Sequence, residues 1–208
     1  MTIRDPLGSP VDSHEFSQQL ATIVGLTEGI KGVVAIASQI NVMALNAIVL
    51  SQRAGEIAQG FGVISKELRA LSMELTSLMN ALSADAFTVV NLVSDQLRRE
   101  RRYQLLRAAQ LVLPDPSAPL NRVLAEQQTR FQSCTQEVHE RRLCLLDRLE
   151  EARKLCRFGT AISRSAKIEA AFGQGFRSAL GGVSQDFDKT IQTILPSIEA
   201  LIDKVEHI

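Results

Sequence analysis

The chain has 208 residues, of which 45% are hydrophobic but only 4% aromatic, and it contains no Trp. This length can bury a substantial core, and the scarcity of aromatic residues, Gly and Pro favours helices over strands. The 23 basic and 23 acidic side chains balance, which excludes a general electrostatic attraction to nucleic acid or to an anionic membrane.

Cysteine usage and the N-terminus both favour a cytoplasmic location. Cys134, Cys144 and Cys156 are odd in number and form no C-x-x-C pair, so no disulfide framework is predicted. We expect all three to be small core side chains. The first residues lack the apolar segment of a signal peptide.

The first half of the chain predicts a long helical hairpin, residues 13–113. Residues 1–12 contain two Pro and one Gly and are expected to be a flexible tail. From Ser13 onward, apolar residues recur at spacings of three and four, as in a heptad seam. A turn is predicted near 53–60. No Gly or Pro then lies between Gly62 and Pro114, which predicts a helix far longer than the usual 11–12 residues or so.

The second half predicts another helical hairpin, residues 120–208. Three prolines within residues 114–119 break the chain. A helix is expected from about 120 to Phe158, with a soft point at Gly159. Further helix with interruptions follows, and the turn lies near 172–175. The interruptions are expected at Gly173, Gly175, Gly181-Gly182 and Pro196.

The two hairpins show a faint internal repeat. Residues 165–176 echo residues 46–61 if four residues are deleted, which lays Gly175-Phe176 over Gly60-Phe61. Both turns also lie at nearly equal distances from the proline loop. The predicted fold is therefore all-α, with long antiparallel hairpins in a four-helix bundle or coiled coil. Two pseudo-repeated hairpins and four helices without a repeat both remain open.

Residues 32–52 contain no charged side chain and are long enough to cross a bilayer. The same run contains two Asn and two Gln, whose amides are costly in hydrocarbon without partners. We therefore predict a buried, self-associating helix and no membrane span. Asn41 and Asn46 within this run could fix the register of a bundle, or could be polar spots on a helix surface.

Residues 36–71 resemble the signalling tip of methyl-accepting chemotaxis receptors. The shared residues are Ile36, Ala37, Gln39, Asn41, Ala44-Leu45-Asn46-Ala47, Arg53-Ala54-Gly55-Glu56, Gly60-Phe61, Val63, Glu67, Arg69 and Leu71. In that family the tip is a helical hairpin that dimerises into a four-helix bundle and contacts a histidine kinase and its coupling protein. If only the first hairpin is receptor-like, the chain should be a homodimer; if both hairpins are fused into one bundle, it should be a monomer.

The resemblance implies a partner-binding tip and a non-catalytic role. The implied contact residues are Asn41, Asn46, Arg53, Glu56, Phe61, Val63 and Glu67. Arg53 and Glu56 could also pair across the turn, which would contribute at most about 1 kcal/mol if exposed. The implied partners are the chemotaxis histidine kinase, its coupling protein, or other receptors. No methylation site, ligand-binding domain or membrane anchor is recognised.

The chain also departs from the family pattern at several tip positions. They are Ser38, Leu50, Ser51-Gln52, Ala58 and Gln59. These changes favour the alternative of a receptor-derived scaffold or oligomerisation protein without kinase control. A third option, a ligand-binding helical sensor, would need a pocket or cofactor that the sequence does not indicate.

No enzyme motif is present: the chain has no phosphate-binding loop, nucleophile elbow or H-E-x-x-H. Cys134, His139 and Cys144 lie five residues apart, which on a helix spreads them around the axis, so they cannot share one metal ion. We predict no catalytic residues, no metal site and no cofactor.

Overall fold

The computed structural model describes residues 13–112 and 118–206, which are almost entirely helical. The four long helices are α1 (Ser13–Ala54), α2 (Gln59–Val112), α3 (Ala118–Phe172) and α4 (Arg177–Glu206). Two short 3-10 segments, η1 (Gly55–Ala58) and η2 (Gln174–Phe176), make the turns. The predicted tail 1–12, Pro114 to Ser117 of the proline loop and residues 207–208 lie outside the described residues.

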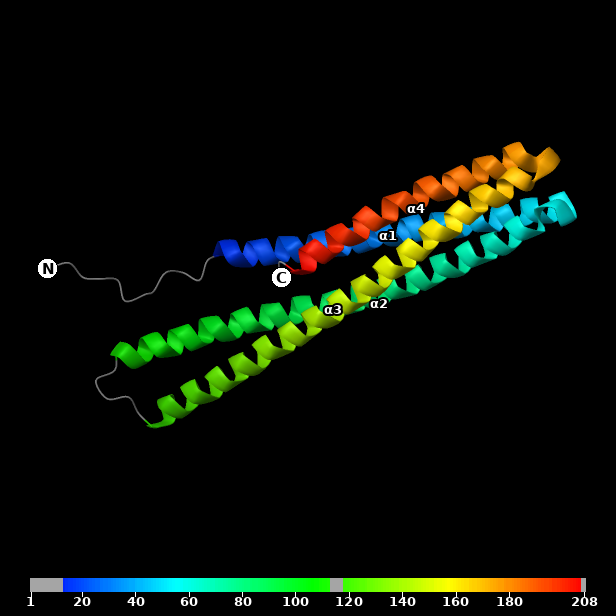
Figure 1. Ribbon diagram of the computed structural model, residues 1–208. Coiled ribbons are helices and arrows are strands. Elements are labelled where there is room, and N and C mark those ends of the chain that lie inside the picture. The colour runs from blue at the N-terminus through cyan, green and yellow to red at the C-terminus, as the bar shows by residue number, and fades with distance from the viewer. Residues whose placement is uncertain (1–12, 113–117, 207–208) are drawn as a thin grey trace.

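The helices form an antiparallel bundle in which α1 packs against α2 and α4, and α3 packs against α2 and α4. Both turns lie at the same end of the bundle, where the cyan η1 region sits beside the orange η2 region (Figure 1). The predicted all-helical bundle is confirmed. We call the end that carries η1 and η2 the tip.

Heptad-spaced apolar side chains form one continuous core along the bundle. Leu26, Ile30 and Ile40 on α1 are at most 2% exposed, and burying each contributes roughly 1.5–3 kcal/mol. Toward the tip the α1 seam changes to alanine. The seam residues Ala37, Ala44 and Ala47 are fully buried, and such small side chains let α1 approach its neighbours closely.

The burial pattern of the first hairpin returns in the second at a constant offset of 119 residues. Gly55 and Gln174, which open the two turns, are 119 residues apart. The buried pairs include Leu26 and Leu145, Ile30 and Leu149, Ala47 and Ala166, Ser65 and Ser184, Leu75 and Ile194, and Leu82 and Leu201. Positions 119 residues apart are therefore pseudo-equivalent, with no deletion. The alignment of Gly60-Phe61 with Gly175-Phe176 was wrong.

Several expected helix interruptions do not occur. Helix α3 runs through Gly159, where an added Cβ would lie 3.1 Å from Leu71 Cδ1, so the glycine lets α3 approach α2 closely. Helix α4 runs through Gly181-Gly182 and Pro196 to Glu206. Its buried seam from Leu180 to Val205 favours the helix strongly enough to offset these poor helix formers.

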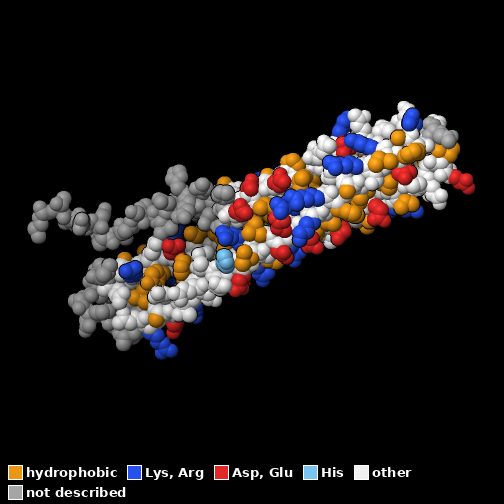
Figure 2. Space-filling model, viewed as in Figure 1, with side chains coloured by type: hydrophobic (Ala, Val, Ile, Leu, Met, Phe, Trp, Pro, Cys, Tyr) orange, Lys and Arg blue, Asp and Glu red, His pale blue; other side chains and the backbone are white. Residues whose placement is uncertain are grey.

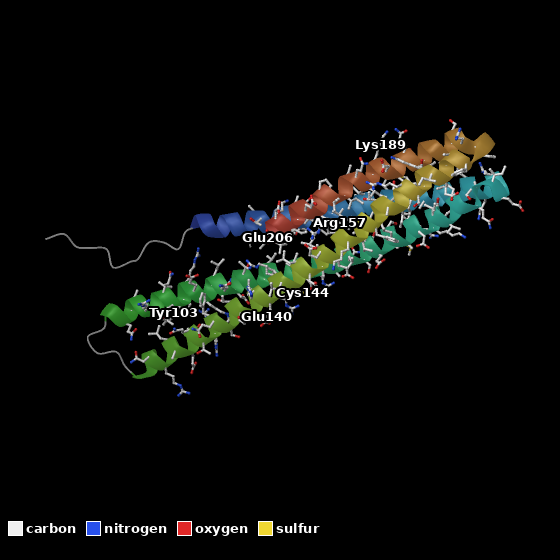
Figure 3. The ribbon with its side chains drawn as sticks, in the orientation of Figure 1. Tyr103, Glu140, Cys144, Arg157, Lys189 and Glu206 are labelled. Atoms are coloured by element: carbon white, nitrogen blue, oxygen red, sulfur yellow. The ribbon has the colours of Figure 1, made fainter. Side chains whose placement is uncertain are left out.

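Helices α2 and α3 extend beyond α1 and α4 at the end opposite the tip (Figure 1). In Figure 3, Tyr103 on α2 lies past Glu206, which ends α4. Nearer the middle of the bundle, Arg148 on α3 pairs with Asp85 on α2 at 2.8 Å. The bundle therefore has four helices on the tip side, α1 continues somewhat past the end of α4, and only α2 and α3 continue past the start of α1 (Figure 1).

Candidate partner-binding site at the hairpin tip

The first turn is tight because a glycine and a buried serine define it. Gly55 has φ of +67°, a left-handed conformation that glycine adopts without steric cost. The Ser51 hydroxyl donates a hydrogen bond of 2.6 Å to the Ala58 carbonyl oxygen, inside the protein. An added Cβ at Gly62 would lie 2.5 Å from Ser51 Oγ, so α2 approaches α1 closely here. These contacts fix the start of α2 relative to the end of α1.

A shallow groove of about 410 Å³ opens beside this turn, between the end of α1 and the start of α2. Its lining combines apolar, amide and oppositely charged side chains: Ile48, Ser51, Gln52, Gly55, Glu56, Gln59, Gly62, Val63 and Lys66. Apart from Ser51 and Gly62, which form its buried floor, most of these residues are exposed. Such a mixed, open surface suits a protein partner better than a small molecule.

Another side of the first turn is covered by the second hairpin. An added Cβ at Gly60 would lie 2.5–3.0 Å from the carboxylate oxygens of Glu169 on α3. Gly60 thus leaves the space that the Glu169 side chain occupies. The first turn therefore packs against the end of α3.

The predicted contact residues divide into exposed and buried groups. Arg53, Glu56 and Glu67 are exposed, and Val63 is 55% exposed although it is apolar. Glu56 and Val63 line the groove. Phe61 is fully buried, so its side chain supports the tip from within the core.

Arg53 and Glu56 form no ion pair in the part of the chain that the structure describes. The expected pair across the turn is therefore absent. Both charges remain exposed near the groove, where a partner could meet them without breaking an internal contact.

The two asparagines differ in their surroundings. Asn46 is exposed, whereas Asn41 is partly buried and its Oδ1 has no hydrogen-bond partner. A buried amide oxygen without a donor costs free energy, roughly 1–3 kcal/mol. Within the described helices, the Asn41 amide oxygen thus accepts no hydrogen bond from another helix, and such a bond would be needed to fix the register of the bundle.

Sequence reasoning did not assign seven of the groove residues to the site. Three of them, Ser51, Gln52 and Gln59, are positions where the chain departs from the receptor pattern, and the other four are Ile48, Gly55, Gly62 and Lys66. The three departures from the receptor pattern could have indicated the groove, because they cluster at one turn in the sequence. Their common location on one surface depends on how α1 and α2 pack.

The other candidate site residues are the cysteines and the potential metal ligands. No group of three or more His, Cys, Asp or Glu that could hold a metal occurs among the described residues. Cys134 and Cys156 are buried, as expected, but Cys144 is exposed on α3, where Figure 3 labels it. Burial raises the pKa of the Cys156 thiol to about 12.

By length and composition, a helical stretch within residues 21–110 could cross a membrane. Its apolar seam residues Val33, Ala37, Ile40, Ala44 and Ala47 are buried in the bundle core. A core helix of a bundle passes the same test, so this stretch is a weak indication of a span.

Residues 11–99 match the family model of the methyl-accepting chemotaxis protein signalling domain, a non-catalytic, cytoplasmic chemotaxis signalling module. A probable chemoreceptor of Sinorhizobium fredii is 39% identical over 70 residues, which are 34% of this chain. The methyl-accepting chemotaxis protein McpB of Pseudomonas aeruginosa is 41% identical over 59 residues, 28% of this chain. The match spans 8% of the length of each relative. No solved structure matches.

Proposed function

From the match of residues 11–99 to the chemotaxis receptor signalling domain, we propose that this protein is a cytoplasmic, non-catalytic chemotaxis signalling protein. It binds a chemosensory histidine kinase, its coupling protein, or both, through the tip of the α1–α2 hairpin. The observation that carries the proposal is the groove at η1, because it lies within the matched residues and presents Glu56 and Val63.

The chemistry of the groove supports a protein partner. Val63 lines the groove with the charged Glu56 and Lys66 and is 55% exposed, and Ile57, which follows Glu56 in the chain, is 48% exposed. Apolar contacts would supply affinity and the flanking charges would orient the partner. Gly55 and Ser51 hold this surface in one conformation before binding, which lowers the entropic cost of association.

A titration with a purified chemotaxis coupling protein tests the proposal. We expect wild-type protein to bind and the double variant Arg53→Ala/Glu56→Ala to bind at least about tenfold more weakly, since about 1.4 kcal/mol corresponds to a factor of ten. Both side chains are exposed, so the variant should fold normally.

The matched control is Glu28→Ala/Lys31→Ala. Glu28 and Lys31 form an exposed ion pair of 2.8 Å on α1, roughly 35 Å from the turn along the helix. The control variant therefore also removes one charge of each sign, but far from the groove. The control should bind like wild type. Absence of wild-type binding at high micromolar concentration, or equal affinities for all three proteins, would contradict the proposal.

The departures Ser51, Gln52 and Gln59 in the groove favour one alternative, a receptor-derived scaffold that binds without controlling the kinase. Kinase autophosphorylation in the presence of coupling protein separates the two functions. A change in the phosphorylation rate on adding this protein supports signalling, whereas binding with an unchanged rate supports the scaffold.

A further inference from the structure

The two hairpins place two pseudo-equivalent turns at the tip, but their exposed surfaces differ. At the 119-residue offset, Arg53 corresponds to Phe172 and Glu56 to Gly175. The second turn therefore lacks both charges of the first. In their place it exposes an apolar ring, because Phe172 is 70% exposed.

The walls of the groove also change between the two hairpins. Ile48 corresponds to Lys167, whose ammonium lies 2.5 Å from the Asp188 carboxylate of α4. Val63 corresponds to Gly182, which has no side chain and so presents no apolar contact. The apolar contacts of the first groove are thus replaced in the second hairpin by an ion pair that is satisfied internally and by bare backbone.

The second turn is braced in a different way. The first turn uses the Ser51 hydroxyl on the Ala58 carbonyl, whereas Arg177 Nε donates to the Ala171 carbonyl oxygen at 2.9 Å in the second. Arg177 is exposed, while its pseudo-equivalent Ala58 is 2% exposed. Figure 2 views the bundle from the α3 side and shows basic and hydrophobic side chains mixed near the tip.

We infer that one chain carries a single partner site, on the α1–α2 face of the tip, and that the pseudo-equivalent α3–α4 face does not bind this partner. The inference rests on the proposed function. A symmetric bundle made from two identical hairpins would present the site twice. Here Glu169 of the second hairpin packs against Gly60 of the first, so the second hairpin completes the bundle without duplicating the site. The protein is therefore monovalent and cannot crosslink two coupling proteins.

The mass of the complex tests this directly. The full chain is mixed with excess chemotaxis coupling protein and analysed by sedimentation or by size-exclusion chromatography with light scattering. We expect one coupling protein per chain. A complex with two coupling proteins per chain would overturn the inference and leave the proposed function intact. No complex at all would overturn both.

Two matched double variants then locate the site. Val49→Ala/Arg53→Ala alters the first face, and Ile168→Ala/Phe172→Ala alters the pseudo-equivalent residues of the second. Because all four side chains are exposed, both variants should keep the wild-type helix content and melting temperature. The first should bind at least about tenfold more weakly, and the second should bind like wild type with unchanged stoichiometry. Loss of binding in the second variant alone would place the site on the α3–α4 face and overturn the inference.

Discussion

At the scale of single residues, the tip depends on a few close contacts that leave little room for change. Ser51 is 5% exposed, and its hydroxyl donates a hydrogen bond to the Ala58 carbonyl oxygen where η1 joins α2. Gly62 leaves the space for that hydroxyl. A helical hairpin with a longer or unbraced loop would present the same side chains in many orientations, so these contacts decide whether the groove has one shape.

The variant Ser51→Ala tests this brace. It removes a buried hydrogen bond and leaves the Ala58 carbonyl without the hydroxyl, which should lower the free energy of unfolding by about 1–2 kcal/mol. The control is Ser165→Ala, since Ser165 is exposed and its hydroxyl bonds only to Ala161 O at 3.3 Å. Denaturant unfolding measures both. Equal stabilities of the two variants would show that the brace contributes nothing.

The cysteines provide a second test at this scale. Cys144 is exposed, whereas burial raises the pKa of Cys156 to about 12, so its nucleophilic thiolate is scarce at neutral pH. A small thiol reagent at about pH 8 should modify Cys144 rapidly and Cys156 only slowly, and Cys144→Ala should remove the fast phase. Fast modification of Cys156 in folded protein would contradict its burial.

The same shift predicts an effect of alkaline pH on stability. The unfolded Cys156 thiol ionises near 9.0, whereas the folded thiol stays neutral up to about 12. Between these values the unfolded chain binds fewer protons, so ionisation favours unfolding and stability should fall as the pH rises above 9. Cys156→Ala should lose this component of the pH dependence in denaturant unfolding experiments, and Cys144→Ala should retain it.

At the scale of the elements, core packing offsets local helix propensity. Helix α4 contains Gly181-Gly182 and Pro196, yet it continues to Glu206 because its seam buries Ile191, Ile194 and Ile198. Pro196 itself is exposed and cannot donate a backbone hydrogen bond to Gln192. The helix therefore tolerates a residue that costs about 3 kcal/mol in an isolated helix.

Replacing this proline should stabilise the protein. Pro196→Ala restores one backbone hydrogen bond and relieves the ring clash, so the free energy of unfolding should rise by about 1–3 kcal/mol, measured by thermal or denaturant unfolding. Glu199→Ala, on an exposed position of the same helix, serves as the control and should change stability little. A loss of stability on removing Pro196 would mean that the bundle requires a bend at this point.

At the scale of the whole molecule, one chain supplies all four helices of the bundle. The faces of the two hairpins bury each other, from Leu26 and Leu145 near the middle to Ala47 and Ala166 near the tip. No second copy is needed to cover this seam. Light scattering or sedimentation of the purified chain at micromolar concentration should therefore give a monomer mass. A stable dimer would show that the exposed apolar positions, such as Val42 and Val49, bind a second chain.

The helical class and the turn near Gly55 follow from the sequence, because seam periodicity and turn chemistry are local properties. The candidate tip residues came from the resemblance of residues 36–71 to chemotaxis receptors. Sequence reasoning failed at Pro196 and Gly159, where non-local packing offsets local propensity. Three features needed the folded bundle: Phe61 is a core residue, Ser51 and Gln59 share a groove with Glu56, and the hairpins repeat at 119 residues without a deletion. Each of these depends on which faces of distant helices meet, and spacing along one helix does not specify the partner face.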